Sequence, residues 1–266
     1  RKMKRASLPY MGFNTLSAIK KANGGSLKNY KVIYSNLYSK DVANLKAFWA
    51  KRGFKPVFKS VTDDEAFLAQ GDLVVSENSP TVKEILDFMM LWSDNLLADR
   101  LAGLAARAAG YPLNIKGIDT IFRTLLAQFE IDDSKLVVAD ASGLSKKNKI
   151  TAKLMGELLY KIRKDERYAL LYESLPVGGV SGTLQNRFTT TAPSAVGLVR
   201  AKTGTLNGTA TLAGYVQSKD REYVFVTLAD DIAKGNAALN KARAAIDRVL
   251  GRIAAPNIPA EISPAP

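Results

Sequence analysis

The sequence predicts an α+β fold in which an antiparallel sheet is flanked by helices and joined to a helical subdomain. Helical periodicity dominates the middle of the chain, whereas strand patterns gather in its last quarter. That quarter is expected to form three strands, the final two making an antiparallel hairpin: 198–202, 209–217 and 223–228. An amphipathic helix over 237–253 follows, and the proline-rich segment 254–266 has no periodicity, which is typical of a flexible tail.

The first third of the chain has the pattern of a small α/β unit. A helix over 41–51 places apolar residues on one face and ends at Gly53. Short strands are expected on either side of this helix and again before the helical middle: 31–34, 54–58 and 72–76. Pro56 lacks a backbone donor, so strand 54–58 is expected at a sheet edge.

The middle of the chain is expected to be helical. Ser79-Pro80 predicts a helix start, because Ser caps free N–H groups and Pro needs no donor at the first position. A helix rich in small residues over 96–109 is expected to be deeply buried, since Ala and Gly let helices approach closely. Further expected elements are a strand over 136–138 and helices over 117–129 and 151–163, the last capped by Thr151.

The chain of 266 residues contains no His and no Cys. Catalysis by Ser-His-Asp or Cys-His arrangements is therefore excluded within it, as are zinc sites built on these two residue types. A hydrolase made from this chain must activate a hydroxyl group with Lys, a carboxylate or an oxygen-bound metal. The length is sufficient for one large domain or two small ones, with a core that needs no disulfides.

The charge of the chain is strongly positive. Lys and Arg outnumber Asp and Glu by 38 to 25, a formal net charge of +13, which favours polyanionic partners. The basic residues are spread along the chain without interleaved aromatics, so no nucleic-acid partner is expected. No apolar run approaches the roughly 18 residues of a transmembrane helix, so no transmembrane segment is expected.

Three polar motifs interrupt this framework. Ser93-Asp94-Asn95 lies between two helices, Lys202-Thr203-Gly204-Thr205 lies at the end of a predicted strand, and 140–145 is a Gly-containing loop. Each has an ordinary explanation when taken alone: a helix cap, a strand end and a β-turn. Together and in this order, Ser-Asp-Asn and Lys-Thr-Gly belong to the signature of penicillin-binding proteins and class A β-lactamases.

Further segments extend the similarity: Asp140-Ala141-Ser142-Gly143-Leu144-Ser145 with Asn148 and Thr151, Leu175-Pro176-Val177, Gly179-Val180, Gly182-Thr183-Leu184, Arg187-Phe188, Val199-Arg200-Ala201, Leu206-Asn207-Gly208 and Leu212-Ala213-Gly214-Tyr215-Val216. With the two motifs they cover roughly residues 72–253. This region resembles the D-alanyl-D-alanine carboxypeptidase/endopeptidase family of low-molecular-mass penicillin-binding proteins. The resemblance implies a β-lactamase/penicillin-binding transpeptidase-like fold.

The resemblance also assigns catalytic roles to three residues of the two motifs, Ser93, Asn95 and Lys202. The chemistry of these side chains is compatible with those roles. Lys202 supplies a fixed positive charge and Ser93 can relay a proton, while Asn95 offers both a donor and an acceptor. Asp94 is expected to point away and cap the following helix.

Substrate-binding roles follow for Thr203, Gly204 and Thr205. The two hydroxyls can bind a carboxylate, and Gly204 lets a substrate backbone lie along the strand. The implied ligands are a peptidoglycan peptide ending in D-Ala-D-Ala and β-lactam antibiotics, with no cofactor and no metal. The implied location is periplasmic or extracytoplasmic.

The family nucleophile is the Ser of a Ser-x-x-Lys motif that precedes Ser-Asp-Asn. The chain has one match, Ser17-Ala18-Ile19-Lys20, which the polar segment 21–25 follows, whereas the family helix continues apolar and buried. The nucleophile is therefore expected upstream of this chain. Residues 1–70 are then the end of an inserted α/β domain or its connection, and 71–253 the C-terminal portion of the peptidase domain. A nucleophile on a separate chain of a nicked protein and a true pseudoenzyme are the alternatives.

The expected function is a serine-type D-Ala-D-Ala carboxypeptidase/endopeptidase. The alternative is a catalytically dead module that binds peptidoglycan peptides; a β-lactamase is a weaker third, because 110–188 contains no recognisable Glu-containing deacylation loop. The active-site interpretation predicts that the Ser93 hydroxyl and the Lys202 ammonium face each other across one groove that Asn95 also lines. Helix capping alone predicts no such convergence.

Overall fold

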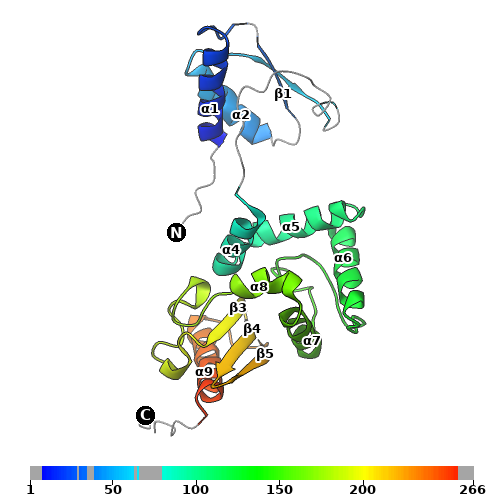
Figure 1. Cartoon of the computed structure of the whole chain (residues 1–266), viewed down its shortest axis with the longest axis vertical. Coiled ribbons are helices and arrows are strands. Elements are labelled where there is room, and N and C mark those ends of the chain that lie inside the picture. Colours follow the sequence, from blue (N-terminus) through cyan, green and yellow to red (C-terminus); the bar gives the residue numbers. More distant parts are fainter. Residues whose placement is uncertain (1–7, 29, 35–38, 63–64, 66–79, 257–266) are drawn as a thin grey trace. The chain divides into compact units, whose positions relative to one another are not determined.

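The computed structural model describes residues 8–28, 30–34, 39–62, 65 and 80–256. The predicted strand 72–76, the predicted cap Ser79 and residues 257–266 of the predicted tail lie outside the described residues. The chain forms two compact units, Arg1–Pro80 and Thr81–Pro266, whose elements are drawn in Figure 1. Each unit is described by itself.

The first unit packs two helices against a two-stranded parallel sheet: α1 (Leu8–Ala22), β1 (Lys31–Tyr34), α2 (Ser39–Ala50) and β2 (Val57–Ser60). Its buried cluster consists of Leu16, Leu45, Trp49 and Phe54. The predicted strand over 54–58 is wrong by about three residues at its start. Pro56 cannot donate to a ladder, so pairing begins at Val57, whose N–H donates to the Tyr30 carbonyl at 3.1 Å.

The second unit begins with helices: α4 (Val82–Trp92), α5 (Asn95–Ala108), α6 (Ile115–Gln128), α7 (Ala152–Arg163) and α8 (Ala169–Glu173). The predicted start of α4 at Ser79-Pro80 is wrong, because Thr81 is the cap. The Thr81 hydroxyl accepts the Glu84 N–H at 3.2 Å, and the Glu84 carboxylate accepts the Thr81 N–H at 2.8 Å. The predicted cap of α7 is confirmed, since the Thr151 hydroxyl accepts the Leu154 N–H at 3.1 Å.

The expected deep burial of α5 is wrong. Among its residues only Gly103 and Ala106 are buried, while Leu96 and Leu104 are 51% and 55% exposed. The small residues serve one face alone, where α5 packs against α6 and a Cβ at Gly103 would meet Leu113 at 3.8 Å. Close approach on one side does not enclose the helix.

A three-stranded antiparallel sheet follows in the order β3 (Val199–Leu206), β4 (Thr209–Ser218) and β5 (Arg221–Ala229). The three predicted strands and their hairpin are confirmed, but β3 does not end at Lys202. It continues to Leu206, which pairs with Thr209 across the two-residue turn Asn207-Gly208. Gly208 has φ +86°, a left-handed backbone conformation that favours glycine.

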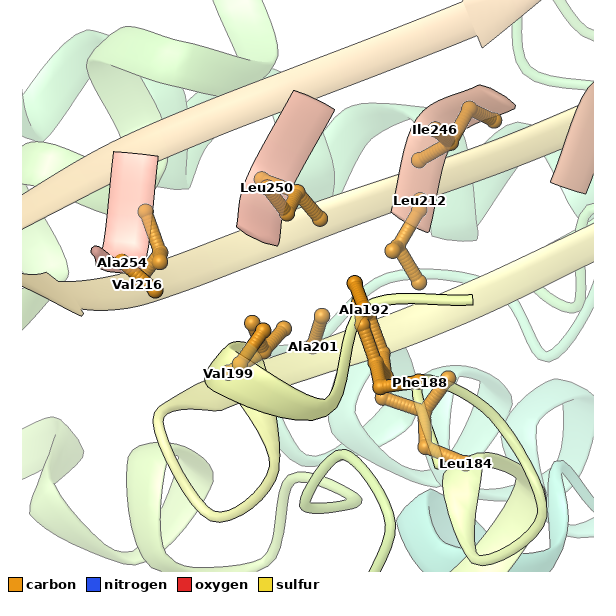
Figure 2. Packing of buried hydrophobic residues seen from close by; sticks show 11 residues of the cluster. Leu184, Phe188, Ala192, Val199, Ala201, Leu212, Val216, Ile246, Leu250 and Ala254 are labelled. Atoms are coloured by element: carbon orange, nitrogen blue, oxygen red, sulfur yellow. The ribbon is translucent and has the colours of Figure 1, made fainter. Parts of the chain in front are cut away.

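The core of the second unit lies between this sheet and α9 (Asn236–Ala254), as Figure 2 shows. In this core, α9 contributes Ile246, Leu250 and Ala254, which pack against the strand residues Val199, Ala201, Leu212 and Val216. Segment 184–195 completes the cluster with Leu184, Phe188, Ala192 and Ala195. A buried ion pair between Arg187 and Asp247 also joins this segment to α9. Because alternate residues of β3 enter the core, Lys202 and Leu206 project from the opposite face.

The predicted strand 136–138 is wrong, because it contains only one bridge, Val137 to Lys149. Side-chain hydrogen bonds replace the next rung of a ladder: Asn148 Oδ1 accepts the N–H of Ala139 at 2.6 Å. The segment is therefore a loop fixed by Asn148 and by the neighbouring Asp140.

Candidate active site

Ser93 lies at the junction of α4 and α5 in a left-handed conformation, with φ 57° and ψ 51°. This conformation is uncommon for a residue other than Gly, Asn or Asp, and it breaks the helix so that the chain turns into α5. The Asp94 carboxylate accepts the Leu97 N–H at 3.0 Å and caps α5, as predicted. Asn95 is the first, exposed residue of α5.

The loop around Gly182 holds the end of α4 close to the sheet. Gly182 has φ +56°, and a Cβ there would lie 2.5 Å from the Leu91 carbonyl oxygen, so only Gly permits this approach. The next residue, Thr183, shares a hydrogen bond of 2.9 Å with the Thr203 hydroxyl of β3. One loop therefore contacts both the helix that precedes Ser93 and the strand that carries Lys202.

Lys202 Nζ donates a hydrogen bond to Ser93 Oγ at 2.6 Å and another to the Thr203 carbonyl at 3.2 Å. Burial lowers the pKa of Lys202 from 10.5 to about 8, because the charged form loses solvent. The lysine therefore remains mainly protonated at neutral pH, yet it can give up its proton far more easily than an exposed lysine. The predicted convergence of Ser93 and Lys202 is confirmed.

The outer edge of β3 is covered in its first half and open in its second half, within the described residues. Segment 176–178 pairs with the first half, where the Ala201 N–H donates to the Pro176 carbonyl at 3.0 Å. Because backbone groups alternate along a strand, Thr203 and Thr205 point their N–H and C=O groups toward the same edge. An extended peptide can therefore pair with this part of β3.

A cavity of about 590 Å³ contains these groups. Ser93, Asp94 and Asn95 line one side, 202–206 line another, and 141–144 of the predicted loop line a third. The expectation that Asn95 and the loop lie beside Ser93 and Lys202 is confirmed. The arrangement places a hydroxyl, an ammonium and a strand edge around one space large enough for a short peptide.

The loop is held by two carboxylates. Asp99 of α5 accepts the N–H groups of Ala141 and Ser142, each at 2.9 Å. Asp140 accepts the Ser145 N–H at 2.6 Å. Burial raises the pKa of Asp140, but hydrogen bonds from Asn148 and the loop backbone outweigh this effect and lower the pKa below its usual value. These hydrogen bonds hold the loop as one wall of the cavity.

Several polar contacts near the cavity could not be predicted from the sequence. Thr183 and Arg187 lie in segments that carried the resemblance, yet nothing in the sequence indicated their partners. Asp99 resembles an ordinary exposed residue of an amphipathic helix, and so does Arg243 of α9, whose guanidinium donates to the Thr205 hydroxyl at 3.0 Å. Such contacts depend on how each helix packs against the rest of the unit, and the spacing of residues along the sequence does not reveal that packing.

The described residues contain no cluster of three or more carboxylate, His or Cys side chains that could hold a metal ion. They also contain no helix long and apolar enough to cross a bilayer.

Comparison with known proteins places this geometry in a family. The D-Ala-D-Ala carboxypeptidase 3 (S13) family matches residues 32–253. The chain is 34% identical over 211 residues to carboxypeptidase DacB of Mycolicibacterium smegmatis, covering 77% of this chain and 45% of the relative. It is 33% identical over 181 residues to D-alanyl-D-alanine carboxypeptidase DacB of Haemophilus influenzae, covering 66% of this chain and 37% of that protein.

A solved structure gives the same result. The crystal structure of penicillin binding protein 4 (dacB) from Haemophilus influenzae superposes with a TM-score of 0.67 at 28% identity, over 79% of this chain and 47% of that one. The chain thus spans less than half the length of these relatives. The family match, the relatives and the α+β architecture agree, and the chain belongs to the D-Ala-D-Ala carboxypeptidase 3 (S13) family.

Proposed function

We propose that the intact protein is a serine-type D-Ala-D-Ala carboxypeptidase/endopeptidase that acts on peptidoglycan peptides and is acylated by β-lactams. The observation that carries this proposal is the 2.6 Å hydrogen bond from Lys202 to Ser93 beside the open edge of β3. The names of the relatives, both carboxypeptidases, support the substrate class. Because peptidoglycan lies outside the cytoplasmic membrane, the protein acts in the periplasm or another extracytoplasmic space.

Ser93 and Lys202 relay a proton to the leaving group in this proposal. Lys202 donates to Ser93 Oγ, so the hydroxyl proton of Ser93 is free to point into the cavity. Ser93 gives this proton to the departing amine nitrogen as the peptide C–N bond breaks, and Lys202 replaces it. The lowered pKa of Lys202, about 8, makes the second transfer easier than from an exposed lysine.

The remaining residues hold the substrate. Asn95 binds the amide of the acyl part, because its side chain both donates and accepts. The peptide lies along β3, where Thr203 and Thr205 present backbone groups and hydroxyls and Gly204 adds no side chain toward the ligand. In this structure, absence of a side chain at Gly204 also leaves room for Thr211, whose hydroxyl would lie 2.2 Å from a Cβ.

The nucleophile is supplied from outside these 266 residues, upstream of the Ser-Asp-Asn motif. Ser17 and Lys20 are exposed on α1, and the family match begins only at residue 32. A nucleophilic serine needs a base in a shielded site, which this exposed pair does not supply. Residues 1–70 form the end of an inserted α/β domain, and 71–253 form the C-terminal portion of the peptidase domain.

Covalent labelling with a fluorescent penicillin tests the proposal. The full-length protein is expected to be labelled one-to-one, and Ser17→Ala in the full-length protein is expected to leave labelling unchanged. Excess unlabelled penicillin and heat-denatured protein are the controls. The 266-residue chain alone is expected to remain unlabelled.

Three results would contradict parts of the proposal. Labelling of the 266-residue chain that Ser17→Ala abolishes makes Ser17 the nucleophile. Labelling that survives this substitution requires another serine of the chain. A full-length protein that binds a D-Ala-D-Ala peptide but is never acylated is the catalytically dead binding module, an alternative favoured by the exposed position of the only Ser-x-x-Lys match here.

A further inference from the structure

Strand β3 separates two cavities, and the second holds a cation that the proposed chemistry does not use. This cavity measures about 480 Å³ and shares Thr203, Gly204 and Thr205 with the first. Lys202 lines only the first cavity, whereas Arg243 of α9 lines only the second. The two hydroxyls of the strand therefore lie between two cationic side chains from different elements.

The Arg243 side chain is held by two hydrogen bonds. One nitrogen donates to the Asn240 side-chain oxygen at 3.1 Å, and another donates to the Thr205 hydroxyl at 3.0 Å. Within the part of the chain that the structure describes, no carboxylate lies within ion-pair distance of this guanidinium. Its charge is thus fixed in position but not neutralised.

The nearest turn of α9 explains why the charge stays uncompensated. Asp247 follows Arg243 by four residues, the usual spacing for a helical ion pair. Its carboxylate instead pairs with Arg187, which also donates to the Arg243 backbone carbonyl at 3.2 Å. Thr191 donates to the same carboxylate at 3.2 Å. The Asp247 carboxylate is therefore engaged by Arg187 and Thr191, and Arg187 anchors the helix turn that carries Arg243.

The hydrogen-bond inventory of Thr205 indicates what Arg243 does. A guanidinium can only donate, so the Thr205 oxygen accepts and its own proton remains available. Among the described residues, this hydroxyl has no second partner. The Thr203 and Thr183 hydroxyls share one hydrogen bond, which likewise leaves one of their two protons free. When Thr183 is the donor of this shared bond, the Thr203 proton stays free, and the Thr203 and Thr205 hydroxyls can both donate to one anion at the strand edge.

We infer that Arg243 is a positioning residue for recognition of a carboxylate. It fixes the Thr205 hydroxyl as a donor, and it adds positive charge on the side of β3 away from Lys202. The ligand is the terminal carboxylate of a peptide or the equivalent carboxylate of a β-lactam. This inference rests on the proposed function, since it assumes that such ligands bind along β3.

The test compares a ligand with and without its carboxylate. Acylation rates of the full-length protein are measured with benzylpenicillin and with its methyl ester. Arg243→Ala is expected to slow acylation by benzylpenicillin by roughly tenfold or more, as for a lost charge-assisted hydrogen bond, and to change the rate for the ester by less than about twofold. Arg243→Lys is expected to recover part of the loss, since it keeps the charge but not the two-pronged contact. Arg248→Ala, on an exposed position of the same helix, is the matched control.

A double-mutant cycle separates positioning from general stability. Thr205→Val removes the hydroxyl and keeps the branched shape, so adding Arg243→Ala to it is expected to cause clearly less loss with benzylpenicillin than Arg243→Ala causes in the parent, the remainder being the effect of the charge. Equal slowing of both ligands by Arg243→Ala, or fully additive effects in the cycle, would overturn the inference while leaving the proposed function intact. A parent protein that neither ligand acylates removes the proposed function and this inference with it.

Discussion

Lys202 Nζ lies 2.6 Å from Ser93 Oγ, although 109 positions separate the two residues in the sequence. Helix capping explains Asp94 but not this contact, because a cap needs only its own helix. The contact joins a helix junction to a strand edge.

Lys202→Ala is expected to slow acylation of the full-length protein by a β-lactam. A charge-assisted hydrogen bond of this kind contributes about 2 kcal/mol, which corresponds to roughly thirtyfold in rate. Lys202→Arg should restore only part of the rate, because a planar guanidinium does not fit the position of a compact ammonium. The measurement is the second-order rate constant for acylation. An unchanged rate in Lys202→Ala would show that β3 is not the substrate edge.

The acylation rate is expected to decrease as the pH rises through about 8, the pKa to which burial lowers Lys202. Above that pH the lysine loses the proton that charges it, and the attraction for a carboxylate disappears with it. Lys202→Arg is the control, because Arg stays protonated and its lower rate should not change between pH 7 and 9. A parallel decrease in this variant would assign the titration to another group.

The same lysine is expected to make protein stability depend on pH. The unfolded chain binds a proton at Lys202 up to about pH 10.5, whereas the folded protein releases it near 8. The free energy of unfolding should therefore rise with pH between these values, where the unfolded state binds more protons. Lys202→Met should remove this rise and increase the free energy of unfolding at pH 7 by about 1–2 kcal/mol. This gain is smaller than the pKa shift alone implies, because the Lys202 ammonium keeps hydrogen-bond partners in the folded protein.

Urea unfolding of the second unit at several pH values checks this prediction. Lys241→Met, at an exposed position of α9, is the matched control and should leave the pH dependence as it is in the parent. Equal pH profiles for the parent and Lys202→Met would contradict the prediction.

Gly182→Ala is expected to disturb both stability and activity. The added Cβ would lie 2.5 Å from the Leu91 carbonyl oxygen, so the end of α4 that precedes Ser93 must move. Gly197 has a similar φ of +78° with open space around it, which makes Gly197→Ala a control for backbone strain alone. We expect about 1 kcal/mol of destabilisation for Gly197→Ala and at least about 2 kcal/mol for Gly182→Ala. Only Gly182→Ala should slow acylation. Similar effects of the two variants on stability and on acylation would show that the close contact between Gly182 and the Leu91 carbonyl has no particular role.

The ion pair between Arg187 and Asp247 is expected to be important for stability. Both side chains are largely buried, at 15% and 4% exposure, so Asp247→Ala leaves Arg187 buried without a counter-charge. The expected loss is about 3–5 kcal/mol in the free energy of unfolding. The exposed pair of Arg167 and Asp165 is the comparison, and Arg167→Ala should leave the unfolding midpoint unchanged. Similar midpoints for the two variants would contradict this assignment.

The order of the Ser-Asp-Asn and Lys-Thr-Gly motifs along the chain predicted the residues at the centre of the site. The periodicity of apolar residues predicted most helices and strands of the second unit. Ser93, Asn95, Lys202 and the loop at 140–145 all line one cavity, as the resemblance implied. Strand β3 extends beyond Lys202 because the Asn207-Gly208 turn lies further along the chain, and this signal was present in the sequence.

Other features could not be read from the sequence because they depend on docking. The contacts of Arg243 and Asp99 follow from the positions of their helices relative to β3 and to the loop. The small residues of α5 indicated a close helix contact, but not that its other face is exposed. The Thr81 cap replaced the expected Ser79-Pro80 start, because Thr81 and Glu84 form a capping box.

The left-handed backbone at Ser93 also limits how this protein could evolve. Thr is the other aliphatic hydroxyl residue, but β-branched side chains are strained at φ 57°. Gly and Asn adopt this conformation readily, yet neither carries a hydroxyl. Serine is therefore the one residue that satisfies both the backbone conformation and the proposed proton relay. If an inhibitor binds in this cavity, we therefore expect escape substitutions at exposed lining residues such as Leu144, where the backbone imposes no such double demand, rather than at position 93.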